Sequence, residues 1–322
     1  MEKNEKKLFI VLEQHLYERY HYMINKYDFD SYLVGGFGDI QIGNSIKHIF
    51  NRIKFRKIIT TEYAKLQCFI NQKSKEYKLE QIYFSNSEGY IAYNILLKIR
   101  ADFPNLELIG LQHGVFELSE APKSKVRYLV NNICKLFYGF YPIGAGFGSK
   151  IVDKYIVYND VYKAFLIDKF NWSETNVSSD INFLKCELFD KRELRKKNKK
   201  VAVFLMQCLN KAGMCSEIDE QFLNKTVLEY LSKRYDTVLV KTHPADTKEL
   251  NFPINTNVKQ IDDLIGAFNC STHAYSFSST TLLEANIFDV KPYAINSKIV
   301  KEDKSIYSVF ENVLSFEDEI IC

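Results

Sequence analysis

The sequence has no long apolar segment. No stretch approaches about eighteen consecutive apolar residues, the length that a membrane-spanning helix needs. The first apolar run, residues 8–12, is only about five residues long, which is too short for a signal peptide or a membrane span. We therefore expect a cytoplasmic protein that could touch membranes only at their surface.

Paired cysteines and metal-ligand spacings are also missing. The 7 cysteines are scattered, odd in number and without a CxxC pair, so we expect a reduced protein without a zinc site. Two of the histidines, His113 and His243, are discussed below. The other four, which are His15, His21, His48 and His273, show no metal-ligand spacing among them. We expect no bound metal.

Two enzyme fingerprints are incomplete or absent. The stretch GGFGD at residues 35–39 follows an apolar run but lacks the remaining spacing of a dinucleotide fingerprint. We interpret it as a glycine loop in which Gly36 lines a cleft. No GxSxG elbow surrounds the serines of residues 276–279, which argues against a serine hydrolase.

The charge balance gives no strong field that would attract nucleic acid. There are 43 Lys and Arg against 40 Asp and Glu, a formal charge of +3. The basic excess is local, and one group lies in KSKVRYLVNNICKLFYGFY at residues 123–141, where cations alternate with aromatics. This composition suits an anionic bilayer surface. The alternative is an ordinary interdomain segment with solvated lysines.

The pattern of apolar runs predicts an α/β protein. The chain is 322 residues long and 46% hydrophobic, which is enough for two domains of about 150 residues. Short β-type runs alternate with longer helical patterns, as in parallel sheets built from βαβ units. We expect two doubly wound, Rossmann-like domains that face one another across a cleft. The boundary is placed at Gly148, in a glycine-rich stretch, and the C-terminal helical segment could pack back on the first domain.

The individual elements are read from the same pattern. Expected strands are residues 8–12, 32–34, 57–60, 81–84, 106–111, 154–158, 201–205, 237–241, 258–260, 274–277 and 291–294. Expected helices include residues 160–170, 218–234, 261–268 and 280–288, and a helical pattern within 89–103.

Polar residues follow two of the expected strands in the second half. VKTHPAD places His243 and Pro244 at the carboxyl end of a strand, where open α/β sheets bind ligands. SFSSTTLLEA places Ser278 or Ser279 as the N-cap of a helix that begins at Thr280. A helix start offers free N–H groups and a positive dipole end. We expect the two strand ends to be adjacent and to form a phosphate site together. Separately, each pattern is more often a plain turn or a plain cap.

Similar signals follow two strands of the first half. LELIGLQHGVFE places Gln112, His113 and Gly114 directly after an apolar strand, and SNSEGYIAY places Glu88 at the start of a helix. Gln112 and Gly114 are candidates to line the cleft on the acceptor side. A satisfied cap is the structural alternative for Glu88, and a buried, hydrogen-bonded histidine is the alternative for His113.

The order of these motifs resembles a known group of enzymes. QHG, then DKYIVYNDVYKAFL, KTHP and SFSSTTLLEA resemble the bacterial GT-B glycosyltransferases of capsule and lipopolysaccharide assembly. Within that group the chain looks most like the CMP-sugar users, the sialyltransferases and Kdo transferases. It is also similar to the teichoic-acid glycerophosphotransferases, which share a His-Gly and a His-Pro.

The resemblance carries over only at matching positions. His243 and Pro244 match the His-Pro motif and Ser278 and Ser279 match the Ser-Ser motif, both of which hold the nucleotide phosphate in that family. Glu88 matches the carboxylate of an acidic-acidic-Gly motif that supplies the general base in several sialyltransferases. This sequence has Ser87 where the family has the preceding acid, which keeps His113 as a second candidate base.

The resemblance implies a metal-independent transfer without a cofactor. A sugar, such as sialic acid, Kdo or a related nonulosonic acid, would move from a CMP-linked donor to a hydroxyl of a saccharide or lipid-linked glycan acceptor. Residues 1–148 would form the acceptor-side domain and residues 149–322 the nucleotide-sugar domain. A polyol-phosphate transferase with a CDP-polyol donor and a noncatalytic nucleotide-binding protein are the alternatives.

Overall fold

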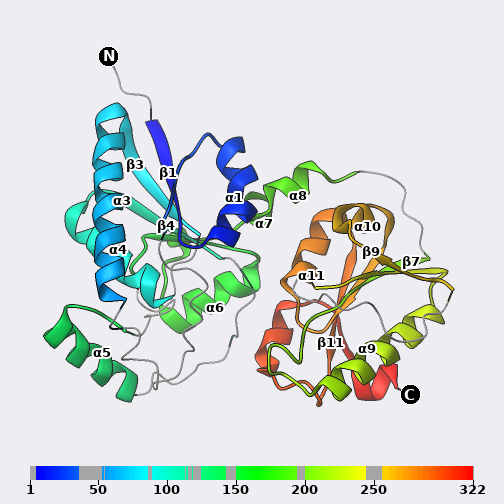
Figure 1. Ribbon diagram of the computed structural model, residues 1–322. Coiled ribbons are helices and arrows are strands. Elements are labelled where there is room, and N and C mark those ends of the chain that lie inside the picture. Colours follow the sequence, from blue (N-terminus) through cyan, green and yellow to red (C-terminus); the bar gives the residue numbers. More distant parts are fainter. Residues whose placement is uncertain are drawn as a thin grey trace. The chain divides into compact units, whose positions relative to one another are not determined.

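The protein is organised as two compact units, each with its own six-stranded sheet (Figure 1). The computed structural model describes residues 5–35, 53, 55–85, 89–112, 114, 118, 125–142, 150–193, 200–243 and 256–321. The first unit comprises residues 1–113 and 120–180, and the second comprises residues 114–119 and 181–322. Each unit is considered by itself.

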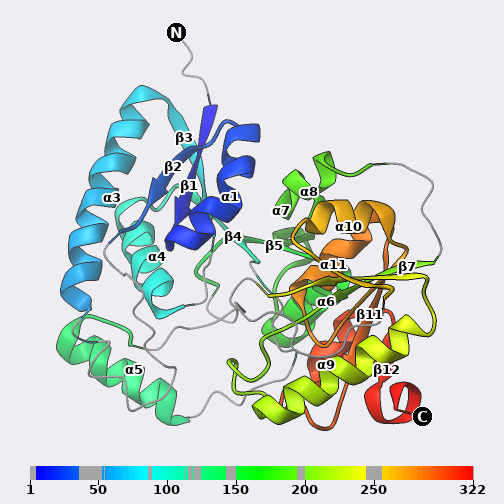
Figure 2. The ribbon, with the colours of Figure 1, turned by 45° about the vertical axis from the view of Figure 1, so that its right-hand side comes forward.

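The sheet of the first unit is entirely parallel, in the order β2-β1-β3-β4-β5-β6. Its strands are β1 (Glu5–Val11), β2 (Asp30–Leu33), β3 (Lys78–Phe84), β4 (Glu107–Leu111), β5 (Lys154–Val157) and β6 (Val177–Ser179). Its helices are α1 (Gln14–Lys26), α3 (Arg56–Glu76), α4 (Tyr90–Asp102), α5 (Lys125–Tyr138) and α6 (Asp160–Phe170). Helix α1 covers one face of the sheet, whereas α3 and α4 pack side by side on the other (Figures 1 and 2).

One expected strand is wrong. Residues 57–60 are helical and lie in the first turns of α3. Ile59, Tyr63, Leu66 and Ile70 are buried along this helix, at spacings of three and four residues. The β-branched residues of RKIITTEY favour a strand locally, but packing of this apolar stripe on the sheet outweighs the local preference.

The boundary between the units also differs from the expectation. Strand β5 pairs with β4, and β6 pairs with β5, so both belong to the first sheet. The first unit therefore runs to Asp180 and does not end at Gly148. The glycine-rich residues 143–149 lie outside the described residues. Glycine content suggested a linker, but the pairing of strands distant in sequence determines the boundary.

The second sheet has the strand order of a Rossmann fold. Its parallel strands are ordered β12-β11-β10-β7-β8-β9, which is 3-2-1-4-5-6 when read from β9 and numbered along the chain. They are β7 (Val201–Leu205), β8 (Thr237–Lys241), β9 (Val258–Ile261), β10 (His273–Ser276), β11 (Lys291–Asn296) and β12 (Val313–Ser315). The helices are α7 (Ile181–Leu184), α8 (Cys186–Asp190), α9 (Glu217–Ser232), α10 (Leu264–Cys270) and α11 (Thr280–Ala285).

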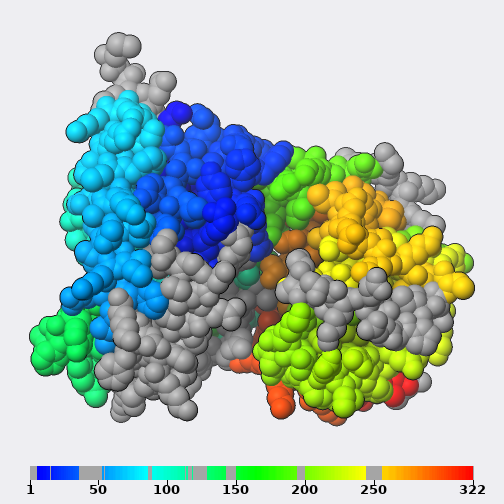
Figure 3. All heavy atoms as spheres, in the orientation of Figure 1, coloured from blue at the N-terminus to red at the C-terminus, as the bar shows by residue number. Residues whose placement is uncertain are grey.

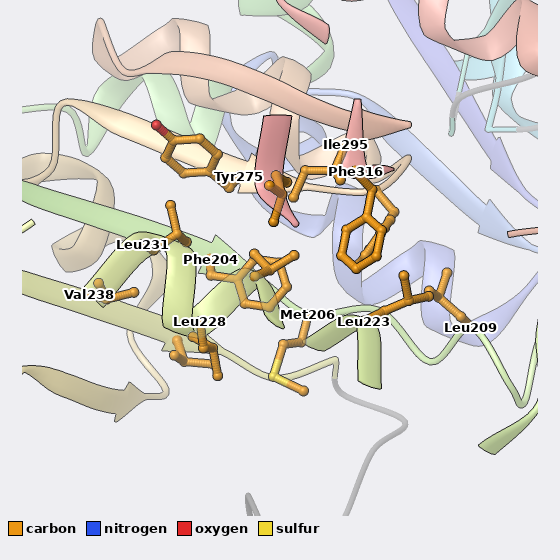
Figure 4. Packing of buried hydrophobic residues seen from close by; sticks show 14 of the residues in the cluster. Phe204, Met206, Leu209, Leu223, Leu228, Leu231, Val238, Tyr275, Ile295 and Phe316 are labelled. Atoms are coloured by element: carbon orange, nitrogen blue, oxygen red, sulfur yellow. The ribbon is translucent and has the colours of Figure 1, made fainter. Parts of the chain in front are cut away.

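The core of the second unit includes the end of the chain. Phe204 of β7 and Leu223 of α9 pack with Phe316 in one buried cluster (Figure 4). Phe316 begins the last helical turn, Phe316–Ile320, and its ring lies 5.9 Å from that of Phe222 on α9. The C-terminal segment thus packs within the second unit. Among the described helices, none combines the length and the apolar character needed to cross a bilayer.

Candidate functional site

The strand order of the second sheet reverses between β7 and β10. The chain continues from β7 to β8 on one side and returns to β10 on the other. At such a switch point the connections diverge and leave a crevice at the carboxyl ends of the strands, which is where open α/β sheets bind ligands. Gln207 follows β7 and Ser278 follows β10, so these two residues lie at the carboxyl ends of the two strands that flank the switch point.

A side-chain bridge ties these two strand ends together. Gln207 Oε1 accepts a hydrogen bond from the Ser278 backbone N–H at 2.8 Å. The hydroxyl of Ser276 donates to the Leu205 carbonyl at 2.7 Å, one step further back along the same strands. Because a backbone N–H can only donate, the bridge assigns the orientation of the Gln207 amide, and its NH₂ group is directed away from Ser278.

The helix after β10 begins as the sequence predicts. Ser279 is the N-cap of α11, and its hydroxyl accepts a hydrogen bond from the Thr281 N–H at 3.2 Å. Helix α11 continues as a 3₁₀ turn, Asn286–Phe288, so the whole of residues 280–288 is helical. The positive end of this segment lies at the switch point and favours an anion there.

His243 lies at the end of the next strand. It is exposed and follows the buried Thr242 at the carboxyl end of β8. The order β10-β7-β8 places β7 between the two predicted strand ends, so β8 and β10 are two strand spacings apart, about 10 Å. The prediction that these two strands are adjacent is therefore wrong. Strand β7, which is followed by Gln207, lies between the strand before His243 and the strand before Ser278. Pro244 lies outside the described residues.

A buried ion pair supports α11 from within the unit. The Lys185 ammonium pairs with the Glu284 carboxylate, and the side chains are only 10% and 9% exposed. Lys185 lies between α7 and α8, and Glu284 is in α11, whose first turn carries Thr280. The pair thus fixes α11 against the segment that opens the second unit.

In the first unit the strand order reverses between β1 and β3. The buried Ser85 follows β3, donates its backbone N–H to the Ile10 carbonyl at 3.2 Å, and accepts from the Leu12 N–H at 3.5 Å through its hydroxyl. Gly89 is the N-cap of α4. The candidate base Glu88 falls between Ser85 and Gly89, outside the described residues.

The Gln-His-Gly motif directly follows β4. Gln112 is 2% exposed, and its Oε1 accepts from the Tyr158 backbone N–H at 2.9 Å. Its own N–H donates to the Ile156 carbonyl at 2.9 Å, which extends the β4–β5 pairing. Backbone groups of β5 and of the residue that follows it, Tyr158, therefore hold Gln112 in place. His113 lies outside the described residues. Gly114 belongs to the second unit, where a Cβ added to it would lie 3.9 Å from Thr280 Oγ1.

Two polar residues near the ends of the strands, Gln207 and Glu62, were not predicted from the sequence. Gln207 carries the same signal as Gln112, a polar residue just after an apolar strand, and could have been found by it. Glu62 is a buried carboxylate that lies 2.6 Å from the Lys65 ammonium. A Cβ added to Gly35 would lie 3.7 Å from the Glu62 carboxylate. No sequence signal marks Glu62, because it resembles any charged residue on a helix. Gly36 lies outside the described residues.

The described part of the chain holds no group of three or more His, Cys, Asp or Glu side chains that could bind a metal ion. The polar groups at the second switch point are a glutamine amide, serine hydroxyls, a helix start and a histidine. These groups donate hydrogen bonds and suit an anion such as a phosphate.

Comparison with known proteins identifies the fold. No protein-family model matches the chain, and no curated protein matches its sequence. The solved structure of CalG4, the calicheamicin glycosyltransferase, is similar with a TM-score of 0.52 at 11% identity, over 98% of this chain and 87% of that one. An α/β-galactoside α-2,3-sialyltransferase from the luminous marine bacterium Photobacterium phosphoreum also gives 0.52 at 11% identity, over 99% and 100% of the two chains. Together with the two six-stranded parallel sheets, these similarities show the GT-B fold of two Rossmann-like domains.

Proposed function

We propose that this protein is a metal-independent glycosyltransferase that moves a sugar from a nucleotide-activated donor to a hydroxyl of a glycan acceptor. The observation that carries the proposal is the Gln207–Ser278 bridge at the switch point of a Rossmann-type sheet, next to the start of α11. The GT-B fold supports it, because its solved examples above are a glycosyltransferase and a sialyltransferase.

The donor in this proposal is a CMP-sugar that carries sialic acid, Kdo or a related nonulosonic acid. Support comes from the sequence, where His243–Pro244 and Ser278–Ser279 resemble the motifs of CMP-sugar users. His243 and the Gln207 amide would donate hydrogen bonds to the phosphate, and the α11 start with Thr280 would add its dipole and hydroxyl. These interactions would strengthen as negative charge develops on the departing CMP.

The acceptor side would supply a general base. Either Glu88 or His113 would take the proton of the acceptor hydroxyl while the oxygen bonds to the sugar and the sugar–phosphate bond breaks. Gln112 is buried and bonded to backbone, so we assign it the task of positioning His113. The described cysteines are free thiols, which fits a reaction in the reducing cytoplasm.

The test is a ligand screen followed by turnover. Thermal shift and calorimetry with CMP, CDP, UDP, GDP and ADP should select CMP, and CMP-sugars should then be hydrolysed or transferred faster than CDP-glycerol. Preference for CDP-glycerol would replace the CMP-sugar donor by a CDP-polyol. Tight nucleotide binding without turnover of any donor would instead indicate a noncatalytic nucleotide-binding protein.

A further inference from the structure

Helix α5 of the first unit presents an uncovered apolar stripe. Leu129, Ile133, Leu136 and Phe137 recur at helical spacing and are all exposed, with Leu136 80% and Phe137 72% accessible. Cys134 of the same helix is buried. Figure 3 shows the side chains of α5 (green) at an outer edge of the first unit. Four large apolar side chains on one face of a helix usually mark a binding surface.

The end of α5 is held firmly against α4. Gly139, with φ +61°, follows the last helical residue as a left-handed cap, and its N–H donates to the Lys135 carbonyl at 2.9 Å. Asn94 of α4 then brackets Tyr141, since its Nδ2 donates to the Tyr141 carbonyl at 2.7 Å and its Oδ1 accepts from the Tyr141 N–H at 3.0 Å. The stripe is thus presented on a fixed support.

A cationic cavity lies beside the last turn of α5. It has a volume of about 280 Å³, and its lining includes Arg56, Lys98, Thr60 and Tyr138. The Arg56 guanidinium donates to the Tyr138 carbonyl at 2.9 Å, and the Lys98 ammonium lies 5.4 Å from the centre of the Tyr63 ring. Two cations around one cavity provide donors for a phosphate group.

The charge of the segment indicates what covers the stripe. Residues 121–152 contain no Asp or Glu, and their Lys and Arg residues are Lys123, Lys125, Arg127, Lys135 and Lys150. A second copy of the chain docked by two-fold symmetry would set this basic segment against itself. An anionic bilayer instead offers both an apolar interior and a negative surface, to which each nearby cation adds about fivefold in affinity.

We propose that α5 docks this protein on an anionic phospholipid bilayer. The apolar stripe enters the interface between headgroups and acyl chains, and a lipid phosphate enters the cavity between Arg56 and Lys98. The inference does not depend on the proposed transferase activity, because it rests on a surface of the first unit and on no residue of the candidate site.

Vesicle flotation of the full chain at low salt tests the stripe. The protein should float with phosphatidylcholine vesicles that contain phosphatidylglycerol, and not with phosphatidylcholine alone. Leu136→Glu should lower the bound fraction by about tenfold or more. Ile218→Glu on α9 is the matched control, since Ile218 is also 80% exposed, and it should bind as the wild type does. No flotation of the wild type, or equal flotation of the two variants, overturns the proposal.

Two further measurements test the cavity and the competing occupant. Lys98→Gln should weaken vesicle binding by about fivefold, whereas Lys225→Gln on the exposed face of α9 should change it little. Equal effects of the two variants overturn the assignment of the cavity to a lipid phosphate. Light scattering of the wild type should give a monomer. A dimer that Leu136→Glu dissociates would identify the stripe as a self-association surface and overturn the bilayer proposal.

Discussion

The Gln207 side chain and the Ser278 backbone are joined by a hydrogen bond of 2.8 Å across the point where the second sheet reverses its order. The bond fixes the loop after β10 to the loop after β7, so the start of α11 has a defined position at the switch point. It also sets which end of the glutamine amide can meet a ligand. In the proposed site, the structural task and the binding task fall to different atoms of one side chain, so substitution can separate them.

Gln207→Leu and Gln207→Glu should differ in stability. Leucine leaves the buried Ser278 N–H without its acceptor, which should lower the free energy of unfolding by about 1–3 kcal/mol. Glutamate keeps an accepting oxygen and should unfold close to the wild type, but its charge near a phosphate should lower CMP affinity by about tenfold. Urea unfolding and calorimetry measure the two quantities. Equal stability of the two variants would mean that the bridge contributes nothing, and unchanged CMP affinity in Gln207→Glu would remove the amide from the ligand site.

His243→Ala should weaken nucleotide binding without unfolding the protein. His243 is exposed, so its loss leaves no cavity. A charge-assisted hydrogen bond to phosphate is worth about 1.5–3 kcal/mol, which corresponds to roughly a ten- to a hundredfold change in the Kd for CMP. His21→Ala, at an exposed histidine of α1, is the control and should bind CMP normally. An unaltered Kd in His243→Ala would refute the role of the His-Pro motif.

One residue of the first unit should act as the base. Glu88→Gln and His113→Ala should be compared, and removal of the true base should lower kcat by roughly 10² to 10⁴ while the Kd of the donor nucleotide stays nearly constant. By the resemblance, loss of activity in Glu88→Gln fits a CMP-sugar donor, and loss in His113→Ala fits a CDP-polyol donor. If both variants turn over at near-normal rates, the proposed mechanism is wrong.

The central elements could be predicted from sequence because their signals are local. Strands β7 and β8 and helix α6 have the predicted bounds, since each is an apolar pattern interrupted by polar or turn residues. The edge strands β6 and β12 were missed because each has only 3 residues. Their strand character comes from pairing with β5 and β11, and a partner distant in sequence leaves no mark on so short a segment.

The site was predictable to the same extent. Ser279 could be placed as a cap because the capping signal lies within its own helix. The bridge could not be foreseen, because Gln207 and Ser278 are 71 residues apart and meet only when β7 and β10 pair. The strand order also could not be read from the chain, so the position of β7 between the two predicted phosphate motifs emerged only with the fold.

Stability should depend on pH through His273. Burial, and after it the nearby Lys291 ammonium, lowers the pKa of His273. The unfolded chain, with a pKa of about 6.5, then binds more protons than the folded one, so stability rises with pH through this window and is lost as the pH falls below about 6.5. His273→Phe keeps a ring beside Tyr235 and Tyr293 but cannot titrate. Urea unfolding near pH 7.5 and near pH 5 should show that this variant loses less unfolding free energy between the two pH values than the wild type does. Identical losses in the two proteins would contradict the assignment.

The Lys185–Glu284 pair should link stability to nucleotide binding. Either single change, Lys185→Met or Glu284→Leu, breaks a buried ion pair and should lower the free energy of unfolding by about 3–5 kcal/mol. Because Glu284 lies in α11, the single variants should also bind CMP more weakly. The double variant removes both charges and should recover most of the stability, since apolar replacement of a whole buried pair is often neutral.

The exposed pair Lys191–Glu187 on the neighbouring helix α8 provides the control, with its atoms 2.6 Å apart. Glu187→Gln should change the unfolding free energy by only about 0.5 kcal/mol or less, because solvent screens the two charges. Urea unfolding of the four Lys185 and Glu284 combinations gives the coupling energy directly. Additive losses in the double variant would show that the two side chains act independently, and normal CMP affinity in both single variants would show that α11 does not need the pair to hold its position.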